Sequence, residues 1–239
     1  MKLSILFSAF TILHVLHGSN SEPGQFAARL IRYDVQPASL AAFRAAVRNY
    51  VIHSLQSEAN VLSEAYYEQE DTTVLWLIER WSNREEMIKA GKSPGFKAIE
   101  SLSRQSLKQQ AKTIYIKDLE PLTRQQWRTA PKKEDRPLTI MLFVDAKAGT
   151  ENTFKTVYHT AMPQFRSEPG VINYQLSQLL DDSTQFVTYE KFRDEAAFQY
   201  HLNFQPIQPV IDYLNTSIKK QPFQANLHRL IEFAPLSIQ

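Results

Sequence analysis

The sequence contains no cysteine among its 239 residues. Disulfides, thiolate nucleophiles, iron–sulfur clusters and cysteine-based zinc sites are therefore excluded, and the fold must be held by packing alone. An excess of one charge is also missing, since 27 basic residues stand against 25 acidic ones and the net charge is +2. Without a broad basic field, no nucleic-acid partner is expected. With 43% apolar residues, the chain can still bury an ordinary core.

The amino-terminal apolar segment, residues 3–16, is too short to cross a bilayer, which takes about 20 apolar residues. It follows Lys2 and precedes the small polar residues 18–21. This order is typical of a secretory signal peptide. We therefore expect residues 1–21 to be a signal peptide, and the mature protein to be exported (periplasmic or secreted) with no membrane attachment after processing. The alternative is a buried first strand or helix.

Two segments of the chain repeat one pattern. Glu79, within residues 78–86, has its counterpart 111 residues later at Glu190, within residues 189–197. Further pairs at the same spacing are Asp34 and Asp145, Phe43 and Phe154, and Asp71 and Asp182. Because the order of these signals is kept over most of the chain, we interpret the pattern as a duplication.

Each copy predicts the element order β-α-β-β-α-β of a ferredoxin-like module. Apolar opening strands at residues 26–35 and 138–146 are followed by helices whose apolar residues recur at three- and four-residue steps. In the first copy these helix residues are Leu40, Phe43, Val47 and Tyr50. Two strands, a helical stretch capped by Asn83 or Asp194, and a last strand complete each copy.

The predicted fold class is α+β, with two tandem modules at residues 25–120 and 137–236. A polar, proline-bearing linker is expected at 121–136, with Trp127 as an anchor on one module. Strand 74–78 is apolar at both parities, as in a strand buried on both faces. The simplest arrangement is an intrachain pseudo-dimeric α+β barrel in which the two sheets face each other. Further association between chains stays open.

The second copy carries motifs that resemble the antibiotic biosynthesis monooxygenase family. Residues 167–174 place an acidic residue and Gly170 before a strand that contains Tyr174. The sequence Glu190-Lys191-Phe192 is similar to the Glu-x-aromatic end of the family's third strand, and a histidine, His201, follows nine residues later.

The first copy keeps less of the pattern. Glu79-Arg80-Trp81 is present, and residues 92–96 look like the family's Ser-Pro-His-Phe segment. Ala90 stands where the second copy has His201, and the tyrosine position holds Glu64, although Tyr66 is close by. We interpret the first copy as chemically degenerate and expect any catalysis to belong to the second module and to depend on His201.

The resemblance implies an activity. Enzymes of this family insert oxygen into quinols or related phenolic rings without a bound flavin or metal. The resemblance therefore implies that this chain is a cofactor-independent oxygenase with a small aromatic substrate, and that it uses no cofactor and no metal. The implied catalytic residues are His201 as base, Tyr174 as a hydrogen-bond partner of the substrate, and Glu190 as a carboxylate that orients the histidine or accepts a proton. The implied substrate-binding residues are Phe192, Trp81, Tyr66 and Glu79.

Each of these residues also has a structural interpretation. His201 can be a helix-surface or interdomain histidine, Tyr174 a core side chain, and Glu79 one half of a salt bridge. A haem-degrading activity, known in a related branch of the fold, is disfavoured because the copy that holds Trp81 lacks the histidine. The alternative function is a non-catalytic protein that binds a small ligand or a partner on the same barrel.

Overall fold

The computed structural model describes residues 26–235. The predicted signal peptide at residues 1–21 lies outside the described residues, so processing and export remain predictions. Within the described range, none of the helices combines the length and the apolar character needed to span a membrane.

Both halves of the chain follow the expected element order. The first half consists of β1 (Ala27–Asp34), α1 (Leu40–Ser54), β2 (Asn60–Glu68), β3 (Val74–Trp81), α2 (Arg84–Gly91), α3 (Pro94–Ser106) and β4 (Lys112–Leu119). The second half consists of β5 (Leu138–Asp145), α5 (Glu151–Ser167), β6 (Val171–Leu179), β7 (Gln185–Phe192), α6 (Glu195–Leu202), α7 (Gln208–Thr216) and β8 (Leu227–Ala234). Short 3-10 turns lie at Pro37–Ser39, Gln205–Ile207 and Phe223–Asn226.

The second helical stretch of each half is divided into two helices, where the sequence predicted one. Asn83 and Asp194 cap the first of them, accepting from the backbone N–H of Glu86 and Ala197 at 2.9 and 2.8 Å. In the first half, a new helix begins at Ser93 and Pro94 because Ser93 caps it and proline suits the first helical position. The Ser-Pro pair that resembled a family motif is therefore a helix start.

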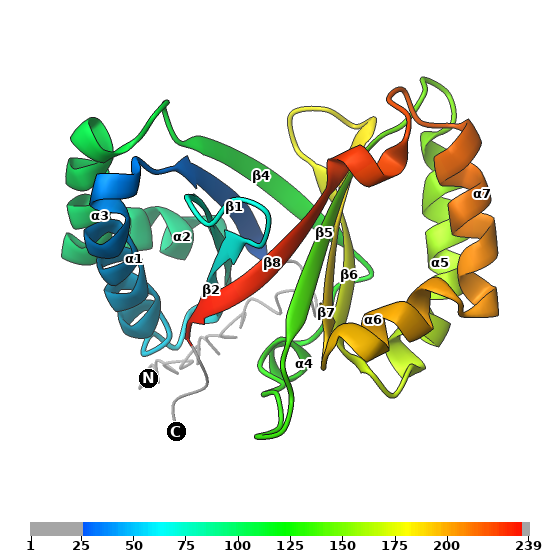
Figure 1. Cartoon of the computed structure of the whole chain (residues 1–239), viewed down its shortest axis with the longest axis horizontal. Coiled ribbons are helices and arrows are strands. Elements are labelled where there is room, and N and C mark those ends of the chain that lie inside the picture. Colours follow the sequence, from blue (N-terminus) through cyan, green and yellow to red (C-terminus); the bar gives the residue numbers. More distant parts are fainter. Residues whose placement is uncertain (1–25, 236–239) are drawn as a thin grey trace, which may run out of the picture.

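The eight strands close into one antiparallel barrel in the order β1-β3-β2-β8-β5-β7-β6-β4. The edge strands of the first half, β2 and β4, pair with β8 and β6 of the second half. Two seams therefore join the halves, and the expected intrachain pseudo-dimeric barrel is confirmed. Figure 1 shows the barrel in the middle, with α1 to α3 on one side and α5 to α7 on the other.

Most strands present one face to the barrel interior and the other to their own helices, whereas the outer face of β4, with Tyr115 and Lys117, is exposed. Strand β3 is buried at all of its positions, as its doubly apolar sequence predicted. The interior holds a mixed core that includes Trp76, Tyr66, Met141 and Leu230. Two further cores, one in each half, lie between sheet and helices.

The segment at 121–136, expected as a linker, packs against the barrel. It contains the short helix α4 (Arg124–Trp127), whose start at Thr123 is a capping box. Trp127 is only 1% exposed, and the Arg80 guanidinium lies 3.8 Å from the centre of its ring. Trp127 therefore anchors this segment at one end of the barrel, which we call the barrel mouth.

Candidate functional site

The predicted site residues lie in three separate places, so they do not form one site. The three groups are His201, Tyr174, Glu190 and Phe192 in the second half, Glu79 and Trp81 in the first half, and Tyr66 inside the barrel. The first two groups lie between sheet and helices, whereas Tyr66 projects from the opposite face of its sheet. Strand parity placed Glu79 with Trp81 and Glu190 with Phe192, but it could not assign a face to Tyr66.

His201 is buried in the second half and is held by a carboxylate. It is 1% exposed, and its Nδ1 lies 2.7 Å from Glu168 Oε1 at the carboxyl end of α5. Its ring packs 4.9 to 5.3 Å, centre to centre, from the rings of Phe165, Tyr174 and Phe192. It is therefore neither at the surface nor between the modules, and it connects α6 to the end of α5.

Little space remains beside this histidine. Tyr174 donates its hydroxyl hydrogen to Glu190 at 3.0 Å. Burial raises the pKa of the Glu190 carboxyl, and the charge of His201 opposes that rise. The cavity that these three side chains line has a volume of about 30 Å³, roughly the share of one water molecule in the liquid. The catalytic roles of His201, Tyr174 and Glu190 remain predictions, and the structure leaves no room for an aromatic ring between them.

The first half has a larger pocket between its sheet and helices, with a volume of about 530 Å³. Known ligand pockets span about 300 to 1,000 Å³. This first-module pocket is lined by Asn49, Tyr50, His53, Ser54, Ser57, Trp81, Glu86, Lys89, Ala90, Ser93, Pro94 and Gly95. Ala90 is one of these lining residues. The position without a histidine, which we interpreted above as degenerate, therefore lies in the half that has the ring-sized pocket.

The difference between the halves follows from equivalent positions of the repeat. Three positions that line the first-module pocket carry small side chains, and their counterparts 111 residues later are larger and contact one another. The pairs are Ser54 and Phe165, Ser57 and Glu168, and Ala90 and His201. Because the larger side chains occupy the corresponding space, the pocket of the second half is filled.

Behind the first-module pocket lies a fully satisfied carboxylate. Glu79 is completely buried and forms an ion pair with Arg29, whose Nη2 is 2.6 Å from Oε2. Its other oxygen accepts from the hydroxyl of Tyr50 at 2.7 Å and from Trp81 Nε1 at 3.2 Å. Glu79 therefore positions two pocket side chains and is not free to take a proton from a ligand.

Tyr50 and His53 were not predicted as site residues. Tyr50 was interpreted only as part of the apolar face of α1, yet its hydroxyl reaches Glu79. Burial, with the nearby Glu79 carboxylate, raises the pKa of the Tyr50 phenol, so this side chain stays a hydrogen-bond donor. His53 is exposed one turn further along α1. The sequence signal that could have identified them is a tyrosine on the buried face of a helix, Tyr50, followed three residues later by a histidine, His53.

Inside the barrel, Tyr66 belongs to a buried polar cluster. Its hydroxyl donates to Glu64 and lies 2.9 Å from the hydroxyl of Tyr189. Lys191 reaches the other oxygen of Glu64 at 2.8 Å and Glu232 at 2.6 Å. This cluster joins β2 of the first half to β7 and β8 of the second.

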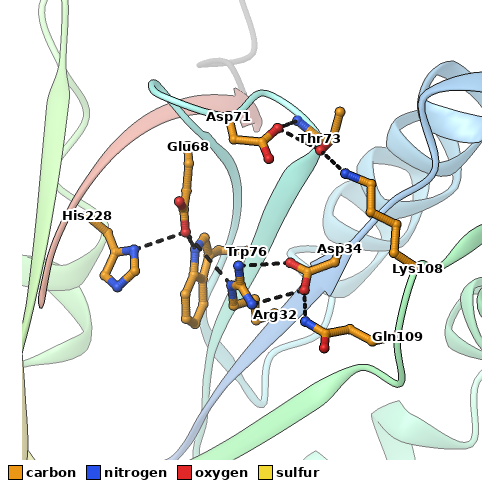
Figure 2. Close-up of polar contacts among 9 residues, drawn as sticks. All are labelled: Arg32, Asp34, Glu68, Asp71, Thr73, Trp76, Lys108, Gln109 and His228. Atoms are coloured by element: carbon orange, nitrogen blue, oxygen red, sulfur yellow. Dashed lines mark hydrogen bonds and ion pairs between the residues drawn. The ribbon is translucent and has the colours of Figure 1, made fainter. Parts of the chain in front are cut away.

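A second polar network lies at the end of the barrel opposite the mouth (Figure 2). Glu68 accepts from Trp76 Nε1 at 2.9 Å and lies 3.0 Å from His228 Nδ1, which comes from β8. Burial raises the pKa of Glu68, but hydrogen bonds from His228 and Trp76 outweigh it and leave the pKa below its ordinary value. Figure 2 shows Arg32 beside this pair and bound to Asp34. The network ties the β2–β8 seam.

Across residues 26–235, no group of three histidine, aspartate or glutamate side chains is arranged to hold a metal ion. The polar clusters above pair acids with bases or with hydroxyl groups, as structural networks do.

Comparison with family models matches the antibiotic biosynthesis monooxygenase model twice, at residues 27–101 and 137–208, together more than half of the chain. A search of curated proteins gave no match.

Solved structures with the same architecture cover most of the chain. A protein of Lactobacillus acidophilus with a proposed monooxygenase activity has a TM-score of 0.71 and 12% identity, covering 87% of this chain and 94% of its own. One of Fusobacterium nucleatum, also with a proposed monooxygenase activity, has a TM-score of 0.72 and 14% identity, covering 87% and 93%. An anthrone oxidase-like protein has a TM-score of 0.62 and 8% identity, covering 88% and 92%. At such identities these likenesses establish the fold alone.

Proposed function

The chain belongs to the antibiotic biosynthesis monooxygenase family, and from this membership we propose that it is a cofactor-independent monooxygenase acting on a quinol or related phenolic compound. The observation that supports the proposal is the first-module pocket, about 530 Å³ in volume and placed between sheet and helices. Trp81 and Tyr50 in its wall supply aromatic surface for a ring.

The proposed reaction needs no external reductant. A ring carbon of the phenol gains one atom of O₂ and becomes a quinone carbonyl, and the second oxygen atom leaves as water. The ring C–H and the phenol O–H supply the two hydrogens of that water, and the substrate supplies all four electrons. The protein has to bind the ring, accept the phenol proton and limit the access of water.

Among the pocket side chains, His53 is the candidate proton acceptor. It lines the pocket and is exposed, and no described residue hydrogen-bonds to its ring. Histidine is the side chain most often used as a general base. Glu79 is unsuited to this role because Arg29 and Tyr50 already occupy its oxygens. Its role in the proposal is to hold Tyr50 and Trp81 in place.

The test is oxygen consumption with a panel of hydroquinones and naphthoquinols. We expect Ala90→Phe, which fills the first-module pocket, to lower kcat/KM at least 10-fold, while Ala45→Phe on the exposed side of α1 leaves it unchanged. His53→Ala should lower the rate by about 100- to 10,000-fold, the usual contribution of a general base. The control His159→Ala, at an exposed histidine, should have no effect.

The same measurements separate the alternatives. Loss of activity with His201→Ala but not with Ala90→Phe would move catalysis to the second module and overturn the assignment of the pocket. Saturable ligand binding at the pocket without oxygen consumption would favour the non-catalytic ligand-binding function. If no compound of the panel were turned over or bound, phenolic compounds would be excluded as the substrate class.

A further inference from the structure

A second cavity, of about 270 Å³, opens at the barrel mouth. It is separate from the first-module pocket, since its walls come from the barrel interior and from the segment that follows α4. The apolar part of its lining includes Leu55, Val61, Leu62, Trp127, Pro131 and Pro235. Its volume is just below the usual range of ligand pockets, about 300 to 1,000 Å³, and suits a molecule with a single ring.

The floor of this cavity is the Glu64–Lys191–Glu232 cluster. Lys191 Nζ lies 2.8 Å from Glu64 Oε1 and 2.6 Å from Glu232 Oε2. The second oxygen of Glu64 accepts from the hydroxyls of Tyr66 and Tyr189. Glu64 and Lys191 therefore have their partners. Glu232 differs, because its Oε1 accepts no hydrogen bond from any residue in the described range, and its side chain keeps 12% exposure.

Trp127 forms part of the cavity wall, where it is almost fully buried and fixed by the Arg80 guanidinium stacked on its ring. Charge is balanced around the cavity, since Glu64 and Glu232 face Lys191 and Arg128. This balance favours a neutral ligand over an ion.

We propose that the barrel-mouth cavity binds a small neutral phenol of one ring, whose hydroxyl donates to Glu232 Oε1 while its ring packs against Trp127. This is a binding site distinct from the first-module pocket. It stands whether or not that pocket supports oxygenation.

The experiment uses the full chain with ¹⁵N-labelled tryptophan and p-cresol as probe. The three tryptophans report on separate places: Trp127 on the barrel mouth, Trp81 on the first-module pocket, and Trp76 on the opposite end of the barrel. Single Trp→Phe variants assign the three indole N–H signals. We expect the Trp127 signal to shift saturably. The methyl ether 4-methylanisole, which cannot donate a hydrogen bond, should bind at least 10-fold more weakly.

Glu232→Gln should weaken p-cresol binding about 10-fold, as expected for loss of a hydrogen bond to a charged acceptor. The matched control is Glu100→Gln, at an exposed glutamate of α3. A shift of Trp81 alone would overturn the barrel-mouth site and leave the proposed function standing. Equal binding of the two probes, or an unmoved Trp127 signal, would also overturn it, and both outcomes are measured on the wild-type chain once the three signals are assigned.

The binding should depend on pH in a defined direction. Burial raises the pKa of Glu232 to about 7, with Lys191 opposing that rise and Glu64 adding to it. Of the other groups at this site, Arg128 stays charged and Tyr66 and Tyr189 stay neutral, because burial raises the pKa of both phenols. The carboxylate accepts the ligand's hydrogen bond, so affinity should rise about 10-fold between pH 6 and pH 8. A flat profile would contradict the role of Glu232.

Discussion

Gly170 and Glu168, which resembled a family motif, both hold α6 against the strand entry of the second half. A Cβ at Gly170 would collide with the Cβ of Ala197, so a side chain at this position has no space. Two residues earlier, Glu168 lies 2.7 Å from His201, also on α6. The acidic residue and the glycine therefore act in helix docking.

We predict that Gly170→Ala destabilises the protein by about 1 to 3 kcal/mol, the usual cost of overpacking. Thermal unfolding of the purified variant measures it, and Tm should fall by several degrees. Gly91→Ala is the control, because a Cβ there would meet Arg29 at an ordinary 3.7 Å. Adding Ala197→Gly should relieve part of the loss. Equal Tm values for Gly170→Ala and Gly91→Ala would contradict the docking role.

Residue pairs on one strand could be predicted from the sequence, but the free space beside them could not. Parity placed Trp81 with Glu79, and the two are hydrogen-bonded at 3.2 Å. The size of the neighbouring pocket depends on helix residues such as Ala90 and its counterpart His201. A histidine attracts a catalytic interpretation and an alanine does not. Yet the alanine lines the larger pocket, because volume depends on how elements pack in three dimensions.

Among the elements, strands β3 and β4 of the first half are joined by a buried ion pair whose carboxylate also binds the second half. Arg80 Nε and Nη2 lie 2.7 and 2.9 Å from the two oxygens of Asp118, and Ser177 of β6 donates to the same carboxylate at 2.7 Å. Both charged side chains are at most 2% exposed. The guanidinium also stacks on Trp127. One carboxylate therefore links the β4–β6 seam to the anchor at the barrel mouth.

We predict that Asp118→Ala costs about 3 to 5 kcal/mol, because it leaves a buried guanidinium without its partner. Chemical denaturation gives the free energy of unfolding. Ser177→Ala removes one neutral donor from the same carboxylate and should cost about 1 kcal/mol. If the two variants were equally stable, the ion pair would not hold the seam. The loss at Asp118 should also shift the indole signal of Trp127.

Element order could be predicted well from the sequence because it depends on local signals. Periodicity identified the strands, and the caps Asn83 and Asp194 stand where the helices begin. The split of the second helical stretch was missed, although Ser93 and Pro94 are a clear helix start. The packing of 121–136 was predicted in part. Its polar composition indicated a linker with Trp127 as an anchor, and Trp127 and Leu122 are both buried against the barrel.

At the scale of the whole molecule, each half has two edge strands that pair only with strands of the other half. Strands β2 and β4 are edges in the first half and are covered only by β8 and β6. The Glu64–Lys191 and Glu68–His228 contacts lie at opposite ends of the barrel and both cross between halves. Figure 1 shows that helices cover only the outer faces. The inner face of each sheet is therefore buried by the other half, together with Leu122 and Trp127 of the segment between them.

We predict that residues 25–120 expressed alone self-associate or are poorly soluble, and that the full chain unfolds in a single transition. The isolated half exposes two strand edges and the apolar inner face that carries Trp76 and Ile78, and both features promote pairing between copies. Sedimentation measures the first outcome, and coincident unfolding curves from tryptophan fluorescence and circular dichroism measure the second. Mixing residues 25–120 with 121–236 should restore a soluble complex. A stable monomer of 25–120, or two separate transitions in the full chain, would show that each half folds independently and that the seams contribute little.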